Sequence, residues 1–108
     1  MTNYPTISIH TKAGLLFIRQ EEILYGQAKG NYTDLFLEDG RQIRVTRQLK
    51  EVNQLLNNEM FIRIHHSHFI NLNHLVSYHE EKVLLDDGSR LTVSKSRKAY
   101  FLELFTRI

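Results

Sequence analysis

Three short polar segments carry side chains that could bind a metal ion, an anion or the edge of a base. The richest is 63–74, which holds four of the six histidines together with an arginine, a serine and two asparagines. Residues 29–33 read Lys-Gly-Asn-Tyr-Thr, and residues 94–98 read Ser-Lys-Ser-Arg-Lys. Each segment supports both a chemical interpretation and an ordinary structural one.

The histidines of 63–74 could supply metal ligands. His66 and His68 would share one face of a strand, and His74 or His79 could be a third ligand. No HExxH pattern accompanies them, and the chain contains no cysteine. The sequence supports nucleophilic catalysis by Ser67 even less, because neighbouring residues on an extended chain point to opposite faces and no GxSxG elbow is present. We therefore expect no enzyme, no metal and no cofactor, with a histidine-based metal enzyme as the weakest alternative.

The histidines also have structural interpretations. His65 lies between Ile64 and an apolar run, 69–72, which predicts a partly buried ring that hydrogen-bonds the backbone of an irregular loop. If Ile64 points inward, alternation turns His66 and His68 to solvent or into the loop, where a binding role and simple solvation stay equally open.

The other two segments could contact nucleic acid. Asn31 could bond an adenine edge and Lys29 a guanine or a phosphate, although Gly-Asn is also ordinary turn chemistry. Lys95, Arg97 and Lys98 stand at the expected start of a helix, where cations oppose the helix macrodipole. That cost favours a polyanionic partner, and a solvated basic turn is the alternative.

Hydrophobic periodicity predicts the elements that must position these segments. Strands are expected at 6–10, 14–19, 23–28, 32–37, 42–46, 60–64, 83–85 and 91–93, with turns rather than regular structure over 69–75. One helix is expected from Leu49, with Thr46 as a possible N-cap and Asn57 after its end. A second begins near Ser94 or Ser96, with an apolar face of Tyr100, Phe101, Leu104 and Phe105.

Part of the pattern occurs twice, 48 residues apart. At that offset six identities align: Leu37, Asp39, Gly40, Val45, Lys50 and Leu56 meet Leu85, Asp87, Gly88, Val93, Lys98 and Leu104. Convergence on one hairpin chemistry and internal duplication are both open, and in either case one hairpin-then-helix unit is used twice.

Length and composition restrict the class of protein. With 108 residues, 42% hydrophobic and 24% charged, the chain predicts one globular domain over 1–108. No apolar run approaches the ~20 residues that span a bilayer, so we expect a cytoplasmic protein without a membrane partner. The net charge of +2 is too balanced to indicate nucleic acid by itself, but the cations of 94–98 predict a local basic patch.

Three stretches together resemble the LytTR DNA-binding domain, the output module of many bacterial two-component response regulators. They are 23–40, 60–75 and 84–95, and the similarity extends from about Ile7 to Phe105. The second stretch is the most specific, because five residues match the family's spaced signature: Phe61, Arg63, His65, Ser67 and Asn71. The resemblance implies a mainly β fold, an elongated stack of small antiparallel sheets with two short helices.

The resemblance also implies a function, a sequence-specific double-stranded DNA-binding domain that regulates transcription. Loops would enter successive major grooves, with Asn31, His66 and Lys95 reading bases. Ten further residues would contact the DNA backbone or support the loops: Lys29, Tyr32, Arg63, His65, Ser67, His68, Asn71, Ser94, Arg97 and Lys98. The implied partners are promoter direct repeats, a second copy on the DNA, and a receiver domain or sensor kinase upstream. The main alternative is a regulatory module that binds a protein through the same loops.

The chain departs from the family pattern in several places. Gly26 and Gln27 replace an apolar and an acidic residue, which predicts a looser strand before the first reading turn. Lys95 replaces the commoner Arg. An ammonium point charge thus stands in place of a planar guanidinium with two parallel donors, and discrimination of guanine from other bases should weaken. His66 stands where a longer basic residue is frequent.

Overall fold

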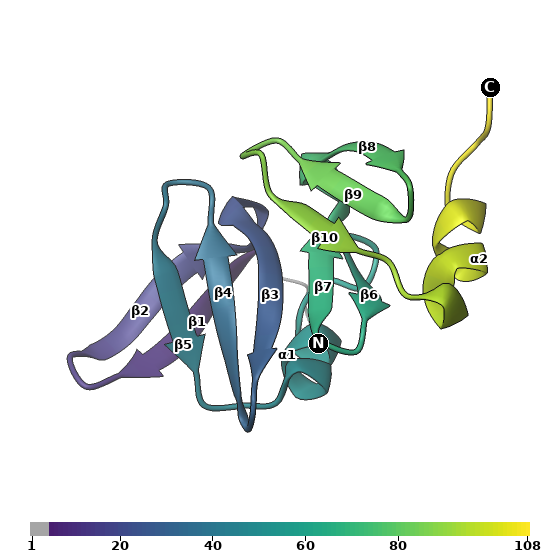
Figure 1. Ribbon diagram of the computed structural model, residues 1–108. Coiled ribbons are helices and arrows are strands. Elements are labelled where there is room, and N and C mark those ends of the chain that lie inside the picture. The colour runs from purple at the N-terminus through teal and green to yellow at the C-terminus, as the bar shows by residue number, and fades with distance from the viewer. Residues whose placement is uncertain (1–4) are drawn as a thin grey trace.

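Ten strands form three small antiparallel sheets in the computed structural model, which describes residues 5–108 (Figure 1). Residues 1–4 of the expected domain lie outside the described part. The first sheet pairs β1 (Thr6–Thr11) with β2 (Gly14–Arg19). The central sheet has the order β5-β4-β3-β7-β6, from β3 (Ile23–Lys29), β4 (Tyr32–Leu37), β5 (Gln42–Val45), β6 (Phe61–His65) and β7 (His68–Asn71). The third has the order β10-β9-β8, from β8 (Leu75–His79), β9 (Lys82–Leu85) and β10 (Arg90–Thr92).

Two short α-helices and two 3₁₀ turns complete the chain. They are α1 (Leu49–Leu55), α2 (Lys95–Glu103), η1 (Gln20–Glu22) and η2 (Leu72–His74). The molecule is elongated, with extents of 46 × 29 × 26 Å. The expectation of a stack of small antiparallel sheets with two short helices is thus confirmed.

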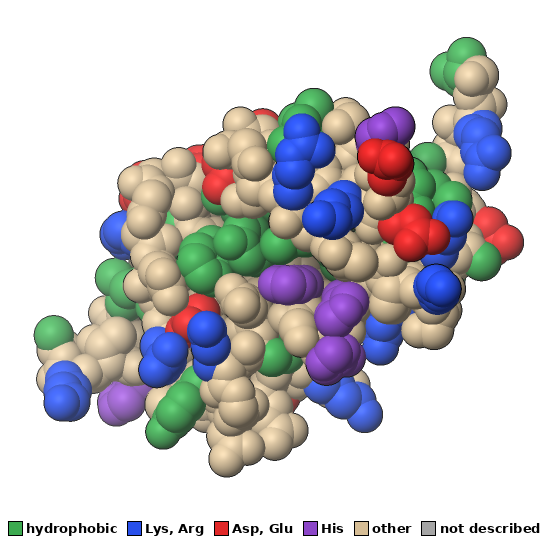
Figure 2. Space-filling model, viewed as in Figure 1, with side chains coloured by type: hydrophobic (Ala, Val, Ile, Leu, Met, Phe, Trp, Pro, Cys, Tyr) green, Lys and Arg blue, Asp and Glu red, His purple; other side chains and the backbone are tan. Residues whose placement is uncertain are grey.

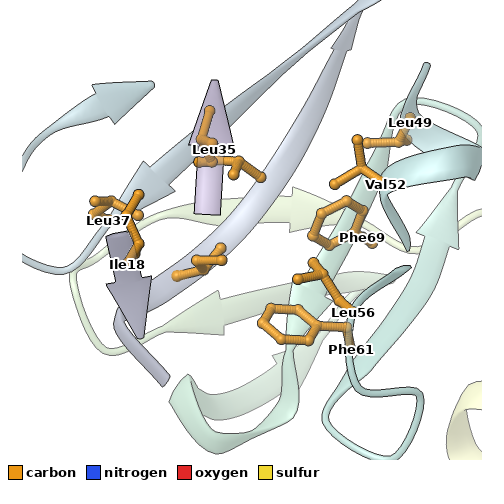
Figure 3. Packing of buried hydrophobic residues seen from close by; sticks show 10 residues of the cluster. Ile18, Leu35, Leu37, Leu49, Val52, Leu56, Phe61 and Phe69 are labelled. Atoms are coloured by element: carbon orange, nitrogen blue, oxygen red, sulfur yellow. The ribbon is translucent and has the colours of Figure 1, made fainter. Parts of the chain in front are cut away.

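The central sheet is buried on both faces. Ile23, Phe61 and Phe69 point to a core beneath β1–β2 and α1, and their successors Leu24, Ile62 and Ile70 point to a core beneath the third sheet. Figure 3 shows the first core, in which the rings of Phe61 and Phe69 meet edge to face with centroids 5.7 Å apart. Because both faces are covered, each of these strands carries adjacent apolar residues where a one-sided strand would alternate apolar and polar ones.

Some expected local features are wrong. Residues 69–75 contain strand β7, η2 and the start of β8, because β7 pairs with β3 and β6 on both sides and this pairing overrides the turn preference of asparagine. The N-cap position of α1 is Gln48, not Thr46. Of the four apolar residues expected on the last helix, only Phe101 is buried; Tyr100 is 60% exposed, and Leu104 and Phe105 lie beyond the end of α2.

Gly26 has a packing role rather than a loosening one. It is buried in β3 between Leu35 of β4 and Phe69 of β7, and any Cβ at this position would overlap the Phe69 ring. The expectation of a looser strand here is therefore wrong, because the missing side chain is what admits the aromatic ring.

The chain uses one architecture twice. A hairpin, a 3₁₀ turn, three antiparallel strands and a helix run from β1 to α1, and the same order runs from β6 to α2. The amide of Glu38 donates to the Glu22 carbonyl at 2.9 Å, and the amide of Asp86 donates to the His74 carbonyl at 3.0 Å. Even the register shift early in β3 recurs early in β8. The expectation that one hairpin-then-helix unit is used twice is confirmed, and the recurring order of elements extends over both halves of the chain.

Within residues 5–108, no helix is long and apolar enough to cross a membrane.

Candidate nucleic-acid interface

The three residues expected to read bases lie on three successive loops. Asn31 is in the β3–β4 turn, His66 in the β6–β7 turn, and Lys95 is the first residue of α2; all three are exposed. In Figure 1 these loops follow one another along the lower side of the molecule, from the β3–β4 turn to the start of α2. Figure 2 shows histidines gathered near the middle of this face, with Lys and Arg around them.

Backbone hydrogen bonds join the three loops in a row. The amide of Ala28, at the end of β3, donates to the Ser67 carbonyl at 2.9 Å. The amide of Ser94, just before α2, donates to the Ile64 carbonyl at 2.8 Å. The β6–β7 hairpin is therefore bonded through its turn to the strand before Asn31 and through β6 to the residue before Lys95.

Arg63 and His65 hold the β6–β7 turn from within. The Arg63 guanidinium donates to the carbonyl of His65 at 2.8 Å and to that of His66 at 2.6 Å. The Ser67 amide donates to Nδ1 of His65 at 3.1 Å, so this nitrogen carries no proton. Burial, followed by the charges of His66, Arg63 and Arg97, lowers the pKa of His65. The expectation that His65 is partly buried and bonds backbone is confirmed, and the turn presents the His66 side chain outward.

His68 differs from the expectation of a solvated or loop position. It begins β7, half-buried, with its ring edge-on to Tyr25 at 6.0 Å between centroids. Burial, and then the nearby His65 and His66, lower the pKa of His68 to about 4, so its ring is neutral near pH 7. A register shift between Arg63 and His65 alters the alternation along β6, and this shift is what simple alternation misses.

Asn71 is a buried structural residue. Its side chain is fully buried, its Nδ2 donates to the Ile23 carbonyl at 2.9 Å, and its Oδ1 accepts from the Asn73 amide at 2.9 Å. The side chain thus joins β7 to the first residue of β3. Contact with a phosphate does not fit this burial, whereas support of the fold does.

The β3–β4 turn is braced by two residues that the sequence did not single out. Gln48 donates from Nε2 to Oδ1 of Asn31 at 3.3 Å. Arg44 lies over the Tyr32 ring at 5.5 Å and bonds the buried carboxylate of Asp34 at 2.9 Å. The Arg44 hydrogen bond is the largest cause of the lowered pKa of Asp34. The sequence does carry a signal for the Asp34–Arg44 pair, because an acidic and a basic residue stand opposite each other on neighbouring strands.

The start of α2 carries free positive charge. Lys95 is exposed and Arg97 half-buried, and within residues 5–108 neither has a carboxylate at ion-pair distance. Lys98 lies 3.6 Å from Glu81. The Ser94 and Ser96 hydroxyls lie 3.3 Å apart, and Ser94 makes no side-chain cap bond. This segment combines two uncompensated cations with hydroxyl groups, which suits a polyanion.

The alternative histidine metal site does not assemble. His66 and His68 lie near the end of β3, whereas His74 lies near its beginning, where it bonds the Glu21 carbonyl and Asp86. In the described part of the chain, no group of three or more His, Asp or Glu side chains is arranged to hold a metal ion.

Comparison with known families agrees with this geometry. The family described as the LytTr DNA-binding domain matches residues 13–106. The chain belongs to the LytTr DNA-binding domain family. A solved LytTr DNA-binding domain, from a Bacillus cereus protein described as a methyl-accepting/DNA response regulator, has a TM-score of 0.78 and 28% identity, over 93% of this chain and 95% of that one. No curated protein matches.

Membership of the LytTr family gives the chain its general role, a DNA-binding regulatory domain. The family is one of DNA-binding domains rather than enzymes.

Proposed function

We propose that this LytTr domain is the sequence-specific DNA-binding part of a bacterial transcriptional response regulator. Its three exposed loops would enter successive major grooves of double-stranded DNA, with Asn31, His66 and Lys95 at the base edges. The observation that carries this proposal is the row of backbone hydrogen bonds that fixes the three loops relative to one another. Loops with fixed spacing suit a regularly spaced helical ligand.

Each base-reading residue has a chemistry that suits a base edge. The Asn31 amide offers one donor and one acceptor, the pair that matches adenine N7 and N6. Lys95 can donate to O6 and N7 of guanine as a point charge. His66 offers a ring nitrogen from a turn whose carbonyls Arg63 already occupies. Specificity then comes from three side chains on a braced scaffold.

Affinity would come mainly from phosphate contacts. Lys29, Arg97 and Lys98 surround the reading positions, and Ser94 offers a hydroxyl. Each neutralised phosphate releases counterions, so binding should weaken steeply with salt. Arg63 and His65 act in this scheme by holding the loop, and Asn71 by holding the sheet.

The partners follow from the resemblance and from the related structure. The family typically binds paired direct repeats, so two copies would lie side by side on promoter DNA. The Bacillus cereus neighbour is described as part of a response regulator, which supports a receiver domain or sensor kinase acting upstream of this domain.

The test is selection of the chain on a random duplex library at near-physiological salt, followed by titration of the selected and a scrambled duplex. We expect one short element, or two at fixed spacing, with a specificity ratio above ~10³. Lys95→Ala should reduce affinity for the selected duplex and relax one base position. Arg97→Gln, in the same helix, is the matched control and should weaken both duplexes alike.

Two outcomes would contradict the proposal. Equal losses on both duplexes for Lys95→Ala would remove its reading role. No selected element, with binding of DNA that is insensitive to salt or absent, would favour a domain that binds a protein partner through these loops.

A further inference from the structure

The junction between β5 and α1 occupies the same place in the first half of the chain as the junction between β10 and α2 in the second. Val45 ends β5 and Val93 directly follows β10, and each packs on a core. Two residues after each valine stands an exposed cation, Arg47 two residues before α1 and Lys95 at the first position of α2. The repeated architecture therefore pairs Arg47 with a residue that the proposed function places at a base edge.

The backbone at Arg47 is anchored beside the first reading turn. The Thr33 hydroxyl donates to the Arg47 carbonyl at 2.8 Å, and Thr33 is fully buried in β4. Since Tyr32 begins β4 directly after the turn, this bond ties the junction to the strand that follows Asn31. The side chain of Arg47 stays 52% exposed and pairs with Glu51 in the first turns of α1.

Gln48 makes direct contact with the reading residue. Its Nε2 donates to Oδ1 of Asn31 at 3.3 Å across 17 residues of sequence. A carbonyl oxygen has two lone pairs, so Oδ1 can accept this bond and one more. The contact holds Oδ1 of Asn31 toward Gln48 and so limits rotation of the amide, and recognition of an adenine edge needs the amide oxygen and nitrogen presented in a defined orientation.

The β3–β4 turn differs in charge from the β8–β9 turn, its equivalent in the second half of the chain. The turn at Asn31 and its neighbouring strand and junction carry Lys29, Arg44 and Arg47, of which Arg44 pairs with Asp34 and Arg47 with Glu51. The equivalent β8–β9 turn consists of Glu80 and Glu81, both with positive φ, and its acidity opposes contact with phosphate. In the first half of the chain both the turn and the junction are thus suited to DNA, whereas in the second half the junction alone is.

We infer that the β5–α1 junction is a further DNA-contacting element, in which Gln48 orients Asn31 and Arg47 contacts a phosphate beside the base that Asn31 reads. This inference rests on the proposed function, because it needs Asn31 at a base edge. Gln48 is a positioning residue, since it acts through Asn31. Arg47 adds affinity that does not depend on sequence.

The experiment measures the chain and its variants on the selected duplex, on duplexes with each base position changed, and across a salt series. Asn31→Ala first identifies the position that depends on Asn31. Gln48→Ala should lower discrimination at that same position by about fivefold, and the double variant should lose no more than Asn31→Ala alone, because the two residues act together. Gln54→Ala is the control: Gln54 is an exposed glutamine of α1, the helix that Gln48 precedes, and its loss should leave discrimination unchanged.

For Arg47 the readout is the salt dependence. Arg47→Gln should weaken selected and scrambled duplexes equally and reduce the slope of log affinity against log salt by about 0.9. Arg41→Gln removes the same charge beyond the opposite end of β4 and should leave the slope unchanged. Circular dichroism of each variant checks that the fold is intact.

The results separate this inference from the function on which it rests. If the unmodified chain selects no duplex, the proposed function fails and the inference fails with it. If the chain selects a duplex, but losses at Gln48 and Asn31 simply add or concern different positions, the positioning role is wrong while the proposed function stands. An unchanged salt slope in Arg47→Gln would remove the phosphate contact.

Discussion

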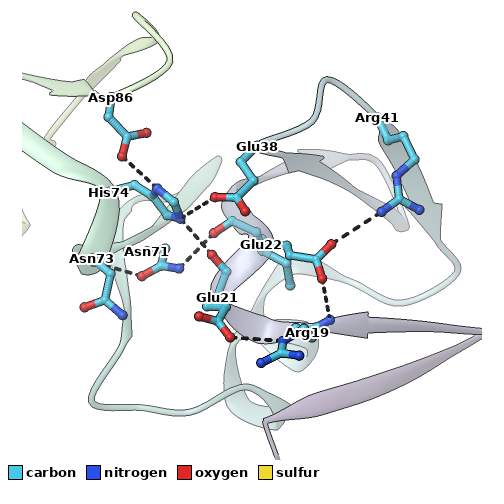
Figure 4. A network of polar contacts seen from close by, with 10 residues as sticks. Arg19, Glu21, Glu22, Glu38, Arg41, Asn71, Asn73, His74 and Asp86 are labelled. Carbon is cyan, nitrogen blue, oxygen red and sulfur yellow. Dashed lines mark hydrogen bonds and ion pairs between the residues drawn. The ribbon is translucent and has the colours of Figure 1, made fainter.

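Replacing His74 by glutamine should reveal a pH-dependent contact that joins the three sheets. His74 follows β7 in η2, and its ring bonds the Glu21 carbonyl of η1 at 2.7 Å and the Asp86 carboxylate of the β9–β10 turn at 2.9 Å (Figure 4). The Glu38 carboxylate of the β4–β5 turn lies 3.7 Å away. Since both ring nitrogens face acceptors, the protonated ring with two donors fits this position best.

The sign of the pH dependence follows from these contacts. Burial by itself would lower the pKa of His74, but the bonds to Glu21 and Asp86 and the charge of Glu38 outweigh it, and the pKa is raised above its ordinary value of 6.5. The folded state then binds a proton more tightly than the unfolded state. The stabilisation by His74 is therefore complete below pH 6.5 and is lost as the pH rises through the raised pKa.

The size of the effect comes from two charge-assisted hydrogen bonds. Such bonds contribute about 1.5–3 kcal/mol each, and the lower value suits Asp86 because it is half-exposed. Glutamine keeps one donor, so His74→Gln should lower the free energy of unfolding by about 2 kcal/mol at pH 6, which is roughly 8–16 °C in melting temperature.

The assay is denaturant unfolding of the parent chain and His74→Gln at each pH from 6 to 9. The difference between the two should shrink as the pH rises. His79→Gln is the control, because His79 lies in β8 with 79% of its side chain exposed, and it should show little difference at any pH. A difference for His74→Gln that stays constant or grows from pH 6 to 9 would refute the reasoning.

Two further substitutions test the core around β3 and β7. Gly26→Ala should destabilise the domain by about 1–3 kcal/mol, because its Cβ would overlap the Phe69 ring; chemical unfolding measures the loss, and unchanged stability would contradict the close packing. His68→Phe should stabilise the domain increasingly as the pH falls from 6.5 towards 4, because the unfolded chain then binds a proton that buried His68 resists. Thermal melts over that range measure the gain, and the sign would be wrong if the gain were largest at pH 8.

The features that the sequence predicts well are those encoded by neighbouring residues. Asp-Gly pairs at Gly40 and Gly88 place two hairpin turns correctly, and both glycines have φ near 90°. The spaced signature from Phe61 to Asn71 identifies the family, and its residues lie in β6, β7 and the turn between them. The exposure of Asn31, His66 and Lys95 follows from their positions in turns or at a helix start.

Other features depend on residues far along the chain. No local pattern indicates that Gln48 bonds Asn31, since the pairing of β4 with β5 brings the two together. His68 is half-buried because a register shift in β6 alters the alternation of side chains there and because its ring packs against Tyr25.

The 48-residue repeat shows both sides of this division. The sequence by itself determines that Glu38 and Asp86 occupy equivalent turns, because local hairpin chemistry recurs at a fixed offset. Only the tertiary structure brings both carboxylates to one histidine, His74, where they raise its pKa and link the sheets. Turn types are set by backbone preferences of adjacent residues, whereas burial, pKa and contact across sheets are set by which strands pair and how the sheets stack.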